Sequence, residues 1–130
     1  MLETGWMESP KQGPIDFDRV LADMAHDPEG FIAVCEVFLE ECPRTLGELA
    51  GTARTDREEL LGVLHEVANS LGVVGAYSAA TIVRQMEMAL REGAPLSLED
   101  LAIFAAQSLV RVASAIEGFI EQRRRPRPRG

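Results

Sequence analysis

The fold of this chain is decided by the stretch LLGVLHEVANSLGVVGA, which spans residues 60–76. Read as a helix, this stretch repeats apolar side chains at the spacing of one buried seam, formed by Leu60, Leu64, Val67, Leu71 and Val74. A second stripe lies about 100° around the helix from the seam and carries Leu61, His65, Ala68 and Gly72. The pattern therefore predicts a central helix whose histidine stands beside the seam among small residues.

The rest of the chain reads as further amphipathic helices joined by short connections. The expected helices span residues 15–25, 28–50, 55–74, 76–92 and 97–122. The sequence contains no stretch with the strict apolar–polar alternation of a half-buried strand. We therefore predict an all-α fold, an antiparallel up-down four-helix bundle with a short additional N-terminal helix.

Polar residues and glycines mark the ends of these helices. Asp27 suits an N-cap, because Pro28 at the first helical position gives up no hydrogen bond. The segments 55–58 and 97–100 have the spacing of a capping box, which begins a helix at the Thr or the Ser. Gly75 is expected to end the central helix. These signals divide the chain into a flexible lead over residues 1–14, a bundle over 15–122 and a basic disordered tail over 123–130.

The net charge of −8 is unevenly distributed along the chain. The final eight residues hold five of the 13 basic residues and no acid, so the other 122 carry eight basic against 21 acidic groups. A body this acidic argues against nucleic-acid binding by the folded part. No stretch approaches 18 consecutive apolar residues and no apolar signal segment begins the chain, so we expect a cytoplasmic protein without a membrane span.

The two cysteines and two histidines do not have the spacing of a metal site. Cys35 and Cys42 are seven residues apart, which is about 10.5 Å along a helix and too far for a disulfide between them. Free thiols suit a reducing compartment, and no Cys or His cluster has zinc spacing. We expect no metal ion and no cofactor bound by this chain.

The residues from His65 onward resemble the signature of the histidine phosphotransfer (HPt) domain family. That signature reads roughly His-x-Leu-Lys-Gly-Ser-Ser-x-x-Leu-Gly-Ala, and the positions that match are His65, Val67, Ser70, Val74, Gly75 and Ala76. The next helix continues the resemblance with Ala79, Val83, Met86-Glu87 and Arg91-Glu92-Gly93. In all, the resemblance covers residues 15–120.

The resemblance implies that this chain is a histidine phosphotransfer protein of a multistep two-component phosphorelay. His65 would accept a phosphoryl group on Nε2 from a receiver-domain aspartate and pass it to another receiver. Neutral imidazole is a good nucleophile near pH 7, and the transfer chiefly needs positioning and charge stabilisation. The chain would be a monomeric phosphoryl carrier rather than a turnover enzyme. Its partners would be receiver domains of hybrid histidine kinases and response regulators, and the Mg²⁺ would lie on the partner receiver domain.

Several residues are expected to form the vicinity of the phosphate and the partner, namely Leu61, Gly62, Ala68, Asn69, Gly72 and Arg91. Leu61 would be an exposed apolar contact for the partner, and Arg91 would reach toward the site from the next helix. Ser70 and Gly75 would give structural support, with the Ser70 hydroxyl bonded to the backbone of its own helix. Glu87 is placed at the rim of the site with a structural role.

Two positions depart from the family signature. Ala68 replaces a Lys that lies one turn from the histidine and can contact the phosphate, so we expect a less stable or more slowly formed phosphohistidine. Asn69 replaces a Gly that lets the receiver approach closely, although its amide could donate to a phosphate oxygen.

These departures keep two other interpretations open. The first is a phosphorylation-independent HPt-like adaptor that binds a histidine kinase or receiver domain by its surface. The second is a helical protein-interaction module unrelated to phosphorelays.

Overall fold

The computed structural model of the chain describes residues 13–125, so most of the predicted lead and tail lies outside the described residues. Within this range the chain is helical and has no strand, which confirms the all-α class. The elements are α1 (Phe17–Asp23), α2 (Pro28–Ala50), the short 3₁₀ helix η1 (Thr52–Arg54), α3 (Arg57–Val73), α4 (Tyr77–Arg91) and α5 (Leu98–Arg124). The last helix thus extends two residues beyond its predicted end at residue 122.

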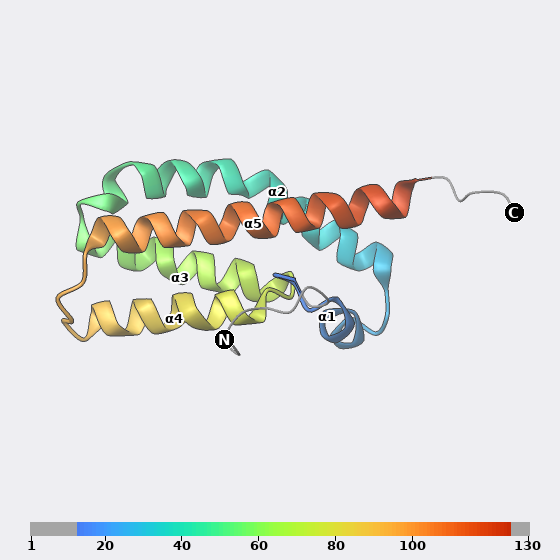
Figure 1. Ribbon diagram of the computed structural model, residues 1–130, viewed down its shortest axis with the longest axis horizontal. Helices are drawn as coiled ribbons and strands as arrows, with labels where there is room; N and C mark the ends of the chain where they lie inside the picture. Colours follow the sequence, from blue (N-terminus) through green and yellow to red (C-terminus); the bar gives the residue numbers. More distant parts are fainter. Residues whose placement is uncertain (1–12, 126–130) are drawn as a thin grey trace, which may run out of the picture.

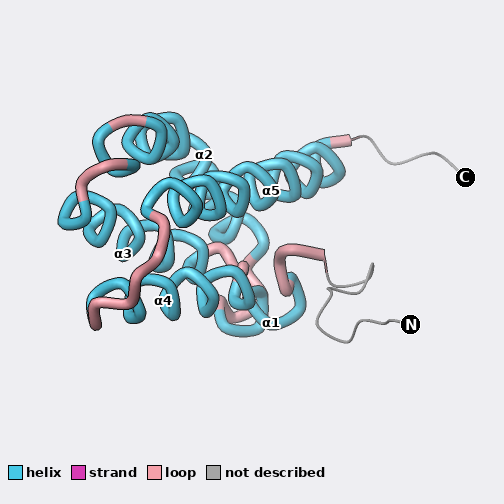
Figure 2. The backbone as a smooth tube through the Cα atoms, turned by 60° about the vertical axis from the view of Figure 1, so that its left-hand side comes forward, coloured by secondary structure: helices cyan, strands magenta, loops and turns pink. Residues whose placement is uncertain are grey.

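The four long helices lie side by side, and each runs opposite to the one before it in the chain (Figure 1). Helix α3 packs most extensively against α4, and α2 packs most extensively against α5. Helix α1 lies near the turn that joins α3 to α4, away from the loop between α4 and α5 (Figure 2). This arrangement leaves the middle of α3 flanked by α4 on one side and by α2 on the other.

Side-chain caps explain where these helices begin. The carboxylates of Asp16 and Asp27 accept hydrogen bonds from backbone N–H groups three residues later, and the Ser97 hydroxyl accepts one from the N–H of Asp100. The caps at Asp27 and Ser97 are those that the sequence predicts. The N-cap of α3 lies one residue later than expected, because Asp56 rather than Thr55 fills this position and accepts a hydrogen bond from the N–H of Glu59 at 3.1 Å. An aspartate satisfies the first free N–H groups directly, so the Thr is not needed for this role.

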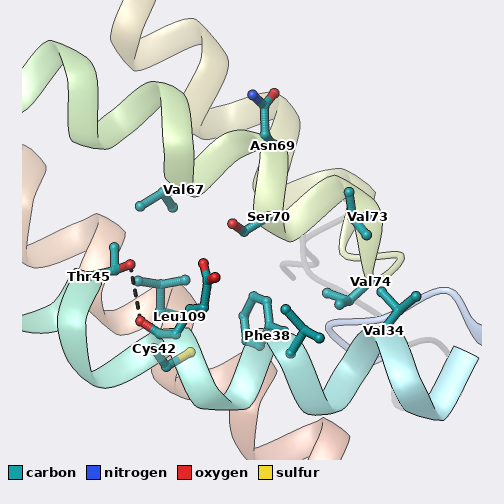
Figure 3. Close-up of a pocket in the computed structure, with 12 residues that line it drawn as sticks. Val34, Phe38, Cys42, Thr45, Val67, Asn69, Ser70, Val73, Val74 and Leu109 are labelled. Carbon is teal, nitrogen blue, oxygen red and sulfur yellow. Dashed lines mark hydrogen bonds between the residues drawn. The ribbon is translucent and has the colours of Figure 1, made fainter.

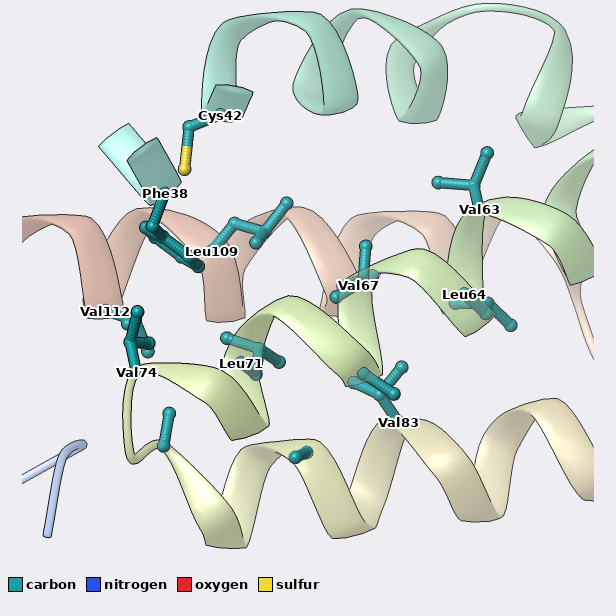
Figure 4. Packing of buried hydrophobic residues seen from close by; sticks show 14 of the residues in the cluster. Phe38, Cys42, Val63, Leu64, Val67, Leu71, Val74, Val83, Leu109 and Val112 are labelled. Atoms are coloured by element: carbon teal, nitrogen blue, oxygen red, sulfur yellow. The ribbon is translucent and has the colours of Figure 1, made fainter. Parts of the chain in front are cut away.

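The predicted seam of α3 forms the centre of the core. All five of its residues, Leu60, Leu64, Val67, Leu71 and Val74, are buried. Figure 4 shows Leu64 and Leu71 facing α4 around Val83, while Val67 points toward Leu109 of α5. Packing on two sides of α3 holds the helix rigidly, so a side chain on its outer face has a fixed position.

Contacts from α1 fix the end of α3. Gly75 follows α3 with a φ of +89°, and its carbonyl accepts a hydrogen bond from the N–H of Asp16 at 3.0 Å. The Tyr77 hydroxyl donates to Asp23 at 3.1 Å. The ring of Phe17 stacks on that of Phe119 in α5, with centroids 4.8 Å apart. The glycine therefore breaks α3 as predicted, and α1 holds the resulting turn in place.

Helix α5 is, by length and composition, apolar enough to cross a membrane, and it is the one such helix among residues 13–125. Its inward side chains, which include Ala105, Leu109 and Ile116, are buried in the bundle. The core helix of a soluble protein meets the same criterion, so this property is weak evidence for a membrane span.

Candidate functional site

The imidazole of His65 projects from the middle of α3 into solvent. Its side chain is 64% exposed, whereas its neighbours Leu64 and Ala68 are buried in the core. The difference between His65 and Leu64 follows from the local sequence, because His65 lies on the stripe beside the seam while Leu64 lies in it. A rigid helix therefore presents a single accessible imidazole.

Glu87 of α4 lies against one nitrogen of this ring. His65 Nδ1 is 3.4 Å from Oε1 and 3.3 Å from Oε2 of Glu87. Only 12% of the Glu87 side chain is exposed, so the carboxylate is held between the two helices. A carboxylate can accept a hydrogen bond but cannot donate one. It therefore favours the tautomer with the proton on Nδ1, which leaves the lone pair on Nε2 available to a reaction partner.

Arg91 extends this contact by one helical turn. Its Nη2 lies 2.6 Å from Glu87 Oε2, an i,i+4 ion pair on α4. The predicted approach of Arg91 to the site thus occurs through Glu87. The result is a line of three groups, His65, Glu87 and Arg91, in which the carboxylate lies between a cation and the imidazole.

The other residues expected around His65 fall into two groups. Gly62 and Asn69 are exposed and Gly72 is half-buried, so all three border the surface next to the imidazole. Leu61 is buried, so the prediction that it is an exposed apolar contact for a partner is wrong. The stripe that carries Leu61 faces the interior at this position, because α4 and α2 cover α3 on two sides.

Ala68 and Ser70 are less exposed than Gly62 and Asn69. Ala68 is buried, so it brings neither charge nor contact area to the face of His65. No hydrogen bond of the Ser70 hydroxyl to the backbone of α3 is present among the described residues. Ser70 instead points between α3 and α2, and Asn69 points away from α2 (Figure 3).

A groove of about 320 Å³ lies between α2 and α3, one turn beyond His65. Apolar side chains form most of its wall, with Phe38 and Val67 on opposite sides (Figure 3). Two exposed valines belong to the same surface, Val37 at 54% and Val73 at 58%. Asn69 borders both this groove and the face of His65, so the imidazole and the apolar surface adjoin each other.

Arg84 of α4 lies over the α3 backbone at Gly72. A Cβ added to Gly72 would be 3.3 Å from Arg84 Nη2 and 3.9 Å from the Cβ of Ala80. A side chain at this position would therefore crowd the guanidinium, and the glycine leaves room for it. Two turns separate Gly72 from His65, which places them on the same face of α3.

The sequence predicts Glu87 at the rim of the site with a structural role, and it does not single out Arg84. The pairing of α3 with α4 would have indicated both, because the antiparallel helices meet at a short turn centred on Gly75. Counting equal steps in both directions from Ala76, the residue after Gly75, brings His65 opposite Glu87 and Gly72 opposite Ala80.

The described residues contain no group of three or more His, Cys, Asp or Glu side chains that could hold a metal ion. Two further charges on α3 and α2 are Glu66, which follows His65 in the chain, and Arg44, whose Nη2 lies 3.7 Å from the Glu66 carboxylate. The site thus offers a nucleophile and fixed charges, and its chemistry needs a second reactant.

Comparison with known proteins bears on what that reactant is. The family model described as Hpt domain matches residues 33–125, which include α3, α4 and nearly all of α2 and α5. Comparison with curated proteins and with solved structures finds no match.

Proposed function

The chain belongs to the Hpt domain family, and from that premise we propose that His65 carries a phosphoryl group between receiver domains of a multistep phosphorelay. Hpt domains are phosphotransfer carriers that interact with receiver domains. The observation that supports the assignment to His65 is its exposed ring on a rigid helix, with Nδ1 held against Glu87.

In the proposed step, Nε2 of neutral His65 attacks the phosphorus of a receiver aspartyl phosphate. The N–P bond forms as the P–O bond to the aspartate breaks, and the carboxylate leaves with the electron pair. The ring keeps its proton on Nδ1 and becomes positively charged. The Glu87 carboxylate beside Nδ1 offsets this charge, and a charge-assisted hydrogen bond of this kind contributes roughly 1.5–3 kcal/mol.

We propose that the receiver docks over the groove between α2 and α3. The exposed Val37 and Val73 supply apolar contact area there, and the groove adjoins His65 through Asn69. A receiver seated on this surface would bring its aspartyl phosphate over the imidazole and exclude water from it. The receiver would also supply the Mg²⁺ that neutralises the transferring group.

The proposal takes the helices as an up-down four-helix bundle with α1 as an addition at its N-terminus. Such a chain would act as a cytoplasmic, monomeric carrier that is itself phosphorylated. Because a carrier only needs one nucleophile on a docking surface, no further catalytic group is required.

The test is phosphoryl transfer from receiver domains labelled with ³²P, made with acetyl phosphate. We expect wild-type protein to acquire an acid-labile label and the His65→Gln variant to acquire none. The matched control is His26→Asn, which removes the other histidine; asparagine tolerates the φ of +56° at this position. This variant should be labelled like wild type.

Two results would contradict the proposal. Label on the His65→Gln variant would place the acceptor elsewhere. A receiver that binds tightly and transfers no label would support the adaptor interpretation, which the absence of a cation at Ala68 keeps open.

A further inference from the structure

The guanidinium of Arg84 lies on the face of α3 that carries His65, two turns from it. It lies over the bare backbone at Gly72, where an added Cβ would be 3.3 Å from Nη2. The side chain is exposed, and it forms no ion pair or hydrogen bond with any described residue. An arginine that is held near a backbone surface without an acidic partner is free to bind an anion.

The guanidinium lies at Gly72, about 10.5 Å along α3 from His65, and helix geometry places the start of its side chain closer to the imidazole. Arg84 lies one turn before Glu87 on α4, about 4.5 Å along the helix axis, and Glu87 is the residue that contacts His65. Gly72 lies two turns after His65 on the same face of α3. Arg84 therefore begins beside the turn of α3 between these two positions, and a rotation of its flexible side chain moves its head toward the ring.

The charges already present explain why a phosphoryl group on His65 would need such a cation. The Glu87 carboxylate lies 3.3 Å from the ring and would repel a phosphate. Ala68 carries no charge, and the Arg91 guanidinium is engaged by Glu87 at 2.6 Å. Among the described residues, Arg84 is a cation near this site that has no carboxylate to neutralise it.

We propose that Arg84 binds the phosphoryl group carried on Nε2 of His65 and so supplies the positive charge that Ala68 lacks. This inference rests on the proposed function of His65. The planar guanidinium can donate two parallel hydrogen bonds to phosphate oxygens. Gly72 leaves room for the guanidinium in the position that the structure shows, because a side chain there would crowd it.

The experiment phosphorylates the protein chemically, so that it does not depend on a receiver. Potassium phosphoramidate transfers its phosphoryl group to Nε2 as its P–N bond breaks and ammonia leaves. All variants carry His26→Asn, which leaves His65 as the one histidine. The ³¹P NMR signal of the phosphohistidine is then followed as a function of pH to find the midpoint of the second phosphate ionisation.

A cation at the phosphate favours the dianion, so it lowers this midpoint. We expect Arg84→Gln to raise it by roughly half a pH unit and Arg84→Lys to restore most of the difference. The matched control is Arg124→Gln, which removes the same charge at the far end of α5, where Arg124 pairs with Glu36 at 2.8 Å. The control should leave the midpoint unchanged.

The outcomes separate the two proposals. A midpoint in Arg84→Gln equal to that in wild type and in Arg124→Gln would overturn the role of Arg84 and leave the carrier function intact. A wild-type His65 that phosphoramidate cannot label would contradict the carrier function itself, and the role of Arg84 with it.

Discussion

The contact between His65 and Glu87 is the residue-scale feature on which the proposed chemistry depends. The carboxylate faces Nδ1 at 3.3–3.4 Å and is largely withdrawn from solvent, so its charge is only partly screened. Its second partner, Arg91, holds it in this orientation. The contact between Glu87 and His65 therefore fixes the tautomer of the imidazole and places a negative charge beside the phosphorylated ring.

Glu87→Gln should slow phosphorylation of His65 roughly tenfold. The amide oxygen can still accept a hydrogen bond from Nδ1–H, but the negative charge that stabilises the phosphorylated ring is lost. Glu87→Ala should slow it further, and ¹⁵N NMR of the imidazole should show a smaller fraction protonated on Nδ1. The control is Glu92→Gln, which removes an exposed carboxylate directly after α4. Equal phosphorylation rates in the Glu87 and Glu92 variants would show that the Glu87 carboxylate has no chemical role.

The turn between α3 and α4 is the feature that decides how these two elements pair. Gly75 adopts a φ of +89°, which costs a residue with a Cβ roughly 1–2 kcal/mol. An added Cβ would also lie 2.8 Å from the Cβ of Val20 in α1. Backbone conformation and the docking of α1 thus both require glycine here, and the turn sets which α4 residues face His65.

Gly75→Ala should lower the free energy of unfolding by about 2–4 kcal/mol, because left-handed strain and overpacking add. Gly62→Ala is the matched control: this glycine lies inside α3, and an added Cβ would meet nothing within 4 Å. It should raise the free energy of unfolding by about 0.5–1 kcal/mol. Urea unfolding followed by circular dichroism measures both, and a neutral Gly75→Ala would mean that α1 does not hold this turn.

At the scale of the whole molecule, the two cysteines report on the integrity of the core. Both lie on the inner face of α2 and are buried. Burial, and to a lesser degree the charge of Glu36, raises the pKa of the Cys35 thiol from 9.0 to about 12. Burial, with a smaller effect of Glu117, also raises the pKa of Cys42. Both thiols are therefore neutral and inaccessible while the bundle is closed.

Above about pH 9 the folded protein should lose stability, because the unfolded chain ionises Cys35 before the folded chain does. The free energy of unfolding should be unaffected by this thiol below pH 9 and should fall as the pH rises toward 12. Urea unfolding at pH 8 and pH 10 measures the loss, and Cys35→Ala should reduce it. Iodoacetamide at pH 9 should modify the native protein far more slowly than the urea-unfolded chain; equal rates would mean that the core is open.

The sequence by itself determined the helices and the caps at Asp27 and Ser97. Each of these follows from local periodicity or from a side chain that bonds its own backbone a few residues away. The tertiary structure decided the burial of Leu61, the contact of Glu87 with His65 Nδ1 and the position of Arg84 over Gly72. They depend on the register and rotation of α4 against α3, which the packing of both helices and the turn at Gly75 set together, and no local pattern encodes that relation.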